Sequence, residues 1–209
     1  RFCDDDGFLN DELELYYRVC AEVWEGPNKI ARIEQTSEKE LYCFDSGTID
    51  SEGGTVDFDL AVFKLNQTQS QVFNIADSLY WAWKYWNNNL GAGAPFFDRT
   101  VTVNWEGGKG NGSFYSDTRG VMVIAGDASS TDEWDDSVIM HEWGHFADHQ
   151  FSCNQNPGGP HPLPGNNTGM NGDKLSWGEG FADYYQSAAR TIEALLAAVQ
   201  SRTWPEAAE

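Results

Sequence analysis

The segment His141-Glu142-Trp143-Gly144-His145 is the strongest constraint on what this chain can fold into. Two histidines four residues apart lie on one face of an α-helix, one turn apart, and can bind the same metal ion. A glutamate directly after the first histidine then lies beside the metal, where it can accept a proton from water that the metal activates. The segment therefore predicts a helix with His141 and His145 as metal ligands and Glu142 as a general base.

A zinc site of this kind needs a third protein ligand and an open position for water. A histidine six residues after His145 would supply one, but that position is Phe151. His149 lies one turn further along the same helix, and a straight helix cannot bend three successive turns around one ion. Glu179 lies on the next predicted helix, with Asp183 four residues later on the same face. Glu179 fits best as the third ligand, and Asp183 as the partner of a ligand histidine's other ring nitrogen.

An alternative interpretation of Glu179 comes from the pattern Ser176-x-x-Glu179, which is also that of a capping box. In that case Glu179 would only close the start of its helix. The neighbouring His141–His145 segment and Asp183 favour the ligand interpretation.

The periodicity of apolar residues changes along the chain and predicts an α+β fold. Apolar and polar residues alternate over 12–23 and 56–60, so we predict an antiparallel β-sheet accessory domain over residues 1–68. From about Gln71 the spacing is helical, and residues 69–209 are predicted to form a second domain. Its expected elements are a helix to about residue 86, strands at 101–103 and 121–124, a helix from about 129–136 past residue 145, a loop over 152–172 and a helix from about 176.

Composition excludes some classes of function. The chain has 33 Asp and Glu against 13 Lys and Arg, a formal charge of −20, and the basic residues are scattered singly. We therefore expect no nucleic-acid partner. No apolar run approaches the roughly 18 residues of a membrane span, so none is expected. Four cysteines without a CxxC pair favour an exported protein with one or two disulfides, and four buried free thiols are the alternative.

The segments HEWGH and GEGFAD together resemble the motifs of the gluzincin metallopeptidases. Their residues are most similar to those of the fungalysin branch and of similar secreted bacterial proteins. The order of elements over 71–149 is similar to the upper lobe of thermolysin-like folds. The resemblance implies a zincin-like catalytic domain with an active-site helix. It implies a role for each of five residues: zinc ligation by His141, His145 and Glu179, general base and acid chemistry by Glu142, and orientation of a ligand histidine by Asp183.

The resemblance implies a secreted zinc metallopeptidase with a polypeptide substrate. No segment resembles the GxMEN motif of gluzincin aminopeptidases, which favours an endopeptidase. The extended substrate is expected to pair with an edge strand at about 120–124. An exported binding or structural module with a catalytically incomplete zinc peptidase core is the alternative function. A zinc hydrolase acting on non-peptide bonds would use the same ligands.

The family pattern also implies a C-terminal lobe with a Tyr or His that stabilises the oxyanion. Only 30 residues follow Glu179, so we expect that lobe to be short, truncated or replaced. His161, in the loop at 157–161, is the first candidate for the catalytic donor, ahead of Tyr184 and Tyr185. A surface histidine is the simpler interpretation of His161.

Two further clusters have a structural and a functional interpretation. The aromatic residues between Trp81 and Trp86 follow a helical spacing that predicts core packing, whereas a sugar-binding platform is the alternative. The run Asp4-Asp5-Asp6-Gly7 lacks the ligand spacing of an EF-hand, so we predict a solvated turn, with Ca²⁺ binding as the alternative.

Overall fold

The computed structural model describes residues 13–46, 49–51, 67–90, 99–153, 155–157 and 170–203. The predicted strand at 56–60, the acidic run at 4–7 and His161 lie outside these residues. The described helices are α1 (Gln67–Leu90), η1 (Asp132–Trp134), α2 (Asp136–Phe151) and α3 (Met170–Thr203). The described strands are β1 (Leu13–Leu15), β2 (Arg18–Cys20), β3 (Glu22–Glu25), β4 (Asn28–Gln35), β5 (Cys43–Asp45), β6 (Ile49–Ser51), β7 (Val101–Trp105), β8 (Phe114–Ser116), β9 (Val121–Val123), β10 (Gly126–Asp127) and β11 (Ser130–Thr131).

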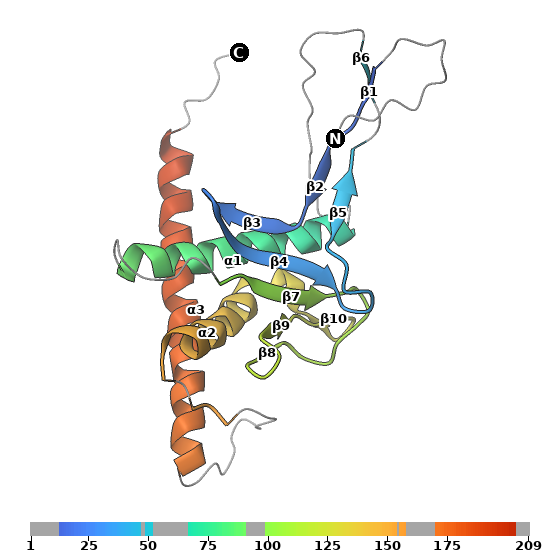
Figure 1. The fold of residues 1–209 in the computed structure, drawn as a ribbon. Coiled ribbons are helices and arrows are strands. Elements are labelled where there is room, and N and C mark those ends of the chain that lie inside the picture. Colours follow the sequence, from blue (N-terminus) through green and yellow to red (C-terminus); the bar gives the residue numbers. More distant parts are fainter. Residues whose placement is uncertain are drawn as a thin grey trace.

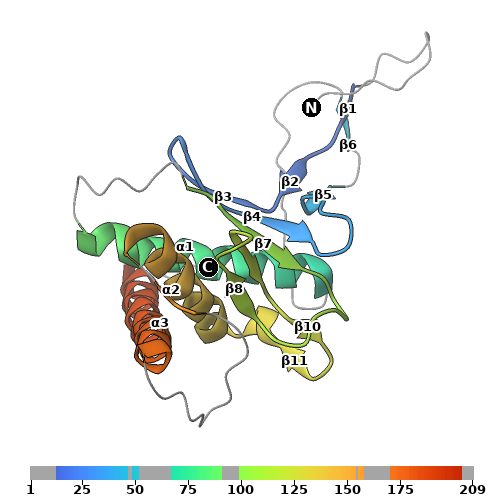
Figure 2. The same cartoon turned by 60° about the horizontal axis from the view of Figure 1, so that its bottom comes forward.

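A five-stranded sheet with the order β3-β4-β7-β9-β8 is the centre of the fold (Figure 1). The pairs β4–β7 and β7–β9 are parallel, whereas the two edge strands, β3 and β8, pair antiparallel with their neighbours. Helices α1 and α2 pack against this sheet, and α3 packs across both of them (Figure 2). The mixed α+β class predicted from the periodicity is confirmed.

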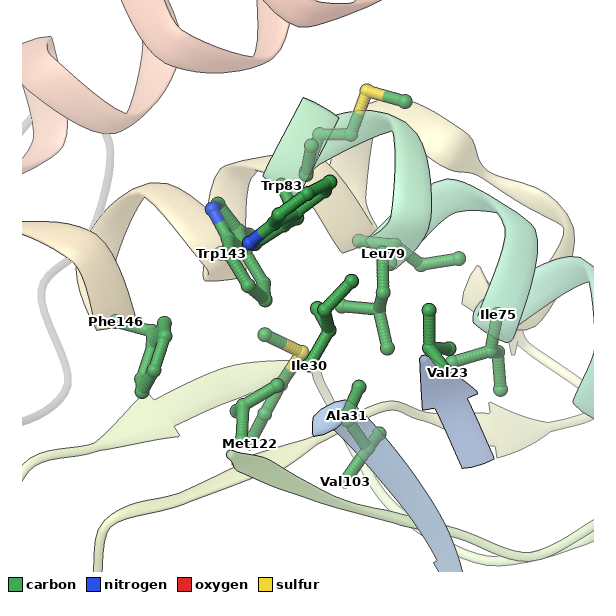
Figure 3. Packing of buried hydrophobic residues seen from close by; sticks show 14 of the residues in the cluster. Val23, Ile30, Ala31, Ile75, Leu79, Trp83, Val103, Met122, Trp143 and Phe146 are labelled. Atoms are coloured by element: carbon green, nitrogen blue, oxygen red, sulfur yellow. The ribbon is translucent and has the colours of Figure 1, made fainter. Parts of the chain in front are cut away.

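One hydrophobic core joins the sheet to the helices. Residues from β4, β7, β9, α1 and α2 meet there, and Figure 3 shows Ile30, Val103, Met122, Leu79 and Trp143 pointing into the same cluster. Each of these five side chains is at most 2% exposed. Burial on this scale provides the main driving force for folding.

The predicted domain boundary at residue 68 is wrong for β3 and β4. Both strands come from the segment expected to fold as a separate β domain, yet they belong to the central sheet. In the parallel register of β4 and β7, Ile33 pairs with Val103, and both side chains are fully buried. Alternation of apolar residues predicts that one face of a strand is buried, but it does not predict which other strand pairs with it.

The alternation over residues 12–23 also does not form one strand. Three short strands replace it: β1 pairs with β6, β2 pairs with β5, and β3 enters the central sheet. The disulfide between Cys20 and Cys43 joins β2 to β5 and confirms that at least one disulfide forms. Cys153 is free and exposed, and Cys3 lies outside the described residues.

The helical predictions between residues 71 and 151 are confirmed. Helix α1 buries Val72, Ile75 and Leu79 completely along one face. Trp83 is 6% exposed, and its aromatic neighbours pack against the same core, which confirms the core interpretation of this cluster. Helix α2 is capped by Asp135, whose carboxylate accepts two backbone N–H bonds from the first turn.

Two expectations near the predicted site need correction. Helix α3 begins at Met170, so Glu179 lies well inside the helix and the capping-box interpretation is wrong. The segment 120–124 does not form an edge, because β9 lies between β7 and β8. Among the described strands, the edge on that side is β8, which follows the glycine-rich turn at 107–112. Among the described helices, none has both the length and the apolar character needed to cross a bilayer.

Candidate metal centre

Helix α2 places His141 and His145 on one face, as their spacing predicts. Their Nε2 atoms lie 3.1 Å apart, and their ring planes are nearly perpendicular, at 82°. The His141 and His145 side chains are 19% and 13% exposed, so solvent reaches this face only in part. Two ring nitrogens therefore converge on one point next to the surface of the helix.

Helix α3 brings a carboxylate to the same point. Oε2 of Glu179 lies 3.4 Å from Nε2 of His141 and 3.6 Å from Nε2 of His145. Within the part of the chain that the structure describes, these three residues are the one group of His, Cys, Asp or Glu whose ligand atoms lie within 4.8 Å of one another. One turn along α3, Oδ1 of Asp183 lies 3.0 Å from Nδ1 of His141.

The close approach of α2 and α3 depends on two small residues. Gly144 lies in the turn of α2 between the two histidines, and Ala182 lies in the turn of α3 between Glu179 and Asp183. A Cβ atom added to Gly144 would lie 2.9 Å from Cα of Ala182. The helices therefore touch through their backbones at the level of the predicted ligands.

Glu142 is almost completely buried beside the two histidines, at 6% exposed. Its Oε2 atom has no hydrogen-bond partner among the described residues. Burial raises the pKa of this carboxyl above its usual value, although the charges of His145 and His141 and a backbone hydrogen bond from Tyr115 act in the opposite direction. A carboxylate oxygen that is buried without a partner is costly, which is typical of a group held for chemistry.

Opposing effects also act on His141. Burial lowers the pKa of its ring, but the hydrogen bond with Glu179 and the charges of Glu142, Glu179 and Asp183 outweigh burial and raise the pKa. The ring nitrogens are thus surrounded by negative groups. Such surroundings favour a positive charge at this point, whether a proton or a metal ion supplies it.

The chemistry of these donors fits Zn²⁺. Two imidazole nitrogens and one carboxylate oxygen are ligands that zinc prefers, and a catalytic site leaves a fourth position open. Tetrahedral ligands at bond lengths of about 2.0–2.1 Å lie about 3.3–3.4 Å apart. The three separations here, 3.1, 3.4 and 3.6 Å, are close to that spacing.

The other candidate residues have different surroundings. Nδ1 of His149 is 2.9 Å from the hydroxyl of Tyr115, and His149 is absent from the converging group, as its place on the helix predicts.

The hydroxyl of Tyr184 bonds that of Tyr85, and the hydroxyl of Tyr185 donates to the carbonyl of Ala82, so both side chains are bonded to α1. His161 stays a prediction, because it lies outside the described residues.

Sequence reasoning missed the contribution of Tyr115 to this site. Its strand, β8, passes α2 at the level of Glu142, and its ring packs edge-on against Phe146 at 5.7 Å. The alternation within β8 covers only three residues, which is too short to predict a strand.

Comparison with known proteins adds one finding. Residues 94–194 match the family model described as Mycolysin C-terminal domain. This mycolysin-like segment is just under half of the chain, and it contains the three converging residues as well as Glu142 and Asp183. No curated protein and no solved structure matches the chain.

Proposed function

We propose that this protein is a secreted zinc metallopeptidase that hydrolyses peptide bonds within a polypeptide. The observation that carries the proposal is the convergence of His141, His145 and Glu179 next to the buried carboxylate of Glu142. Zinc held by these ligands would supply Lewis acidity, which lowers the pKa of water and polarises a substrate carbonyl. The remaining steps depend on side chains of this chain.

Glu142 is the proposed general base and acid. Its unpartnered oxygen accepts the proton of the attacking water and then delivers that proton to the nitrogen of the scissile bond. Asp183 accepts a hydrogen bond from Nδ1 of His141, so that Nε2 presents its lone pair to the site. The low exposure of Glu142 limits competition from bulk water.

The edge strand β8 is the proposed binding surface for the substrate backbone. It pairs with β9 on one side, and on the other side no described strand pairs with it. An extended peptide can add to such an edge through main-chain hydrogen bonds. The backbone hydrogen bond from Tyr115 to Glu142 supports this choice of edge, because it links β8 to the proposed base.

Two other findings support the proposal. Mycolysin C-terminal domains are found in secreted peptidases, and the match covers every residue proposed for the metal site. The disulfide between Cys20 and Cys43 favours an oxidising compartment, because such bonds are rare in the cytosol.

The test combines zinc content with cleavage of casein. We expect one zinc ion per chain in the wild type and in Glu142→Gln, but cleavage by the wild type alone. His145→Gln should lose the zinc, whereas His149→Gln, one turn further along α2, should keep it. A wild-type protein without stoichiometric zinc would refute the proposed metal site.

A binding or structural module with an incomplete peptidase core is a second candidate. It is favoured by the hydroxyls of Tyr184 and Tyr185, which bond to α1 rather than face the histidines. Stoichiometric zinc without cleavage of casein or of a peptide library would support this candidate over the peptidase.

A further inference from the structure

A buried hydrogen-bond chain joins the three helices behind the candidate metal centre. The indole N–H of Trp143 donates to the hydroxyl of Tyr185 at 3.1 Å, and that hydroxyl donates to the carbonyl of Ala82 at 2.6 Å. Trp143 belongs to α2, Tyr185 to α3 and Ala82 to α1. Trp143 is 2% exposed and Tyr185 is 1% exposed, so water does not compete for these bonds.

This series of hydrogen bonds lies close to the proposed ligands. Trp143 is in the helical turn between His141 and His145, and Tyr185 is two residues after Asp183. A Cβ atom added to Gly144 would meet Cβ of Tyr185 at 3.2 Å, so Tyr185 also packs at the contact between α2 and α3. Any shift of α3 relative to α2 would change both this hydrogen bond and the distances from Glu179 to the histidines.

We propose that Tyr185 is a positioning residue for the metal site, because its hydroxyl fixes α3 against α1 and α2. This inference rests on the proposed zinc function. Packing alone holds helices less specifically than a buried hydrogen bond, whose energy depends steeply on distance and angle. A metal site requires bond lengths within about 0.2 Å of their ideal values, so small shifts of a ligand helix weaken binding.

The aromatic ring of Tyr185 has a separate role in packing. It contacts the rings of Tyr85, Trp86 and Phe181, with centroids 5.3, 5.9 and 6.0 Å away. Tyr185→Phe keeps this ring and removes the hydroxyl alone. The substitution therefore separates hydrogen-bond positioning from core packing.

A matched control is Tyr42, which directly precedes β5 and contacts Trp105 of β7. The hydroxyl of Tyr42 donates to the carbonyl of Trp105 at 3.1 Å, and its ring packs against the core. Tyr42→Phe thus removes one tyrosine hydroxyl bonded to a backbone carbonyl, as Tyr185→Phe does. We expect both variants to unfold at a lower denaturant concentration than the wild type.

Zinc affinity distinguishes the two variants. In a competition titration with a chromogenic chelator, Tyr185→Phe should bind Zn²⁺ about tenfold more weakly than the wild type, the lower end of the range for residues that orient ligands. Tyr42→Phe should bind with wild-type affinity. Equal zinc affinity in Tyr185→Phe and the wild type would overturn the positioning role and leave a purely structural one. If Tyr185→Phe does not fold, Trp143→Phe removes the other bond to the hydroxyl and is held to the same criterion.

A crystal structure of each metal-free protein gives a readout independent of zinc. We expect the separation between Glu179 Oε2 and His145 Nε2 to increase in Tyr185→Phe and to stay unchanged in Tyr42→Phe. Superimposable helices in Tyr185→Phe and the wild type would contradict the inference. If the wild type binds no zinc, the proposed function fails, whereas these structures still decide whether Tyr185 positions α3.

Discussion

Oδ1 of Asp183 lies 3.0 Å from Nδ1 of His141, while Oε2 of Glu179 lies 3.4 Å from Nε2 of the same ring. One turn of α3 thus presents a carboxylate to each nitrogen of one histidine. The contact with Asp183 favours a proton on Nδ1, which leaves the lone pair of Nε2 for a metal. The two carboxylates therefore have different roles, although both are acidic residues on the same helix face.

Replacement of Asp183 by Ala is expected to weaken zinc binding by about 10- to 100-fold. The fold should change little, because the Asp183 side chain is 66% exposed. Zinc affinity is measured by competition titration and stability by chemical unfolding. Asp173→Ala, at an exposed position near the start of α3, is the matched control and should leave zinc affinity unchanged. Wild-type affinity in Asp183→Ala would show that Asp183 does not orient the ligand.

Gly144→Ala is expected to destabilise the protein, because the new methyl group would lie 2.9 Å from Cα of Ala182, and backbone cannot move aside cheaply. The loss should be about 1–3 kcal/mol in the free energy of unfolding, with weaker zinc binding as the helices separate. Gly180→Ala is the contrasting variant, since no described atom lies within 4 Å of a Cβ at that helical position.

Gly180→Ala should therefore raise the free energy of unfolding by about 0.5–1 kcal/mol, through helix propensity alone. Urea unfolding of both variants measures the difference. If Gly144→Ala is as stable as Gly180→Ala, the backbones of α2 and α3 do not approach each other at Gly144 as closely as the structure indicates.

The parts of the site that the sequence predicts are those that depend on helical periodicity. The spacing of His141 and His145 determines their shared face, and the same holds for Glu179 and Asp183 on α3. That the two pairs meet is a tertiary relationship, which depends on the contact between Gly144 and Ala182 and on the hydroxyl of Tyr185. No local sequence pattern predicts that the two pairs meet, because a glycine within a helix indicates only a lower helix propensity.

The sheet was harder to predict than the helices for a related reason. The pairing of β4 with β7 joins residues about 70 positions apart, and neither strand contains a signal that selects the other. The position of β9 inside the sheet likewise depends on β8, a strand of three residues. Errors in the predicted domain boundary and edge strand both follow from such long-range pairing.

Acidification should remove the contribution that the ion pair between Glu22 and Lys29 makes to the free energy of unfolding. This ion pair joins β3 to β4. The hydrogen bond from Lys29 is the main cause that lowers the pKa of Glu22 below its usual value. Because the folded-state pKa is lowered, the stabilisation is present above the unfolded pKa of about 4.3 and is lost as the pH falls through the folded pKa.

The wild type should therefore exceed Glu22→Gln in stability by less than about 1 kcal/mol at pH 7, and the difference should disappear towards pH 3. Chemical unfolding of both proteins at several pH values measures it. A difference that stays constant from pH 7 to pH 3 would mean that the ionisation of Glu22 is not its source.

Removal of the disulfide is expected to lower stability without changing the metal site. Cys20 and Cys43 are 23 residues apart, and a crosslink over such a loop contributes about 3 kcal/mol to the free energy of unfolding. The bond joins β2 to β5, which pair with each other outside the central sheet, whereas the proposed ligands lie on α2 and α3. The double variant Cys20→Ser/Cys43→Ser should thus unfold at lower urea concentration and bind Zn²⁺ with wild-type affinity. Weaker zinc binding by the folded double variant would instead show that the β2–β5 ladder is coupled to the helices through β3 and β4.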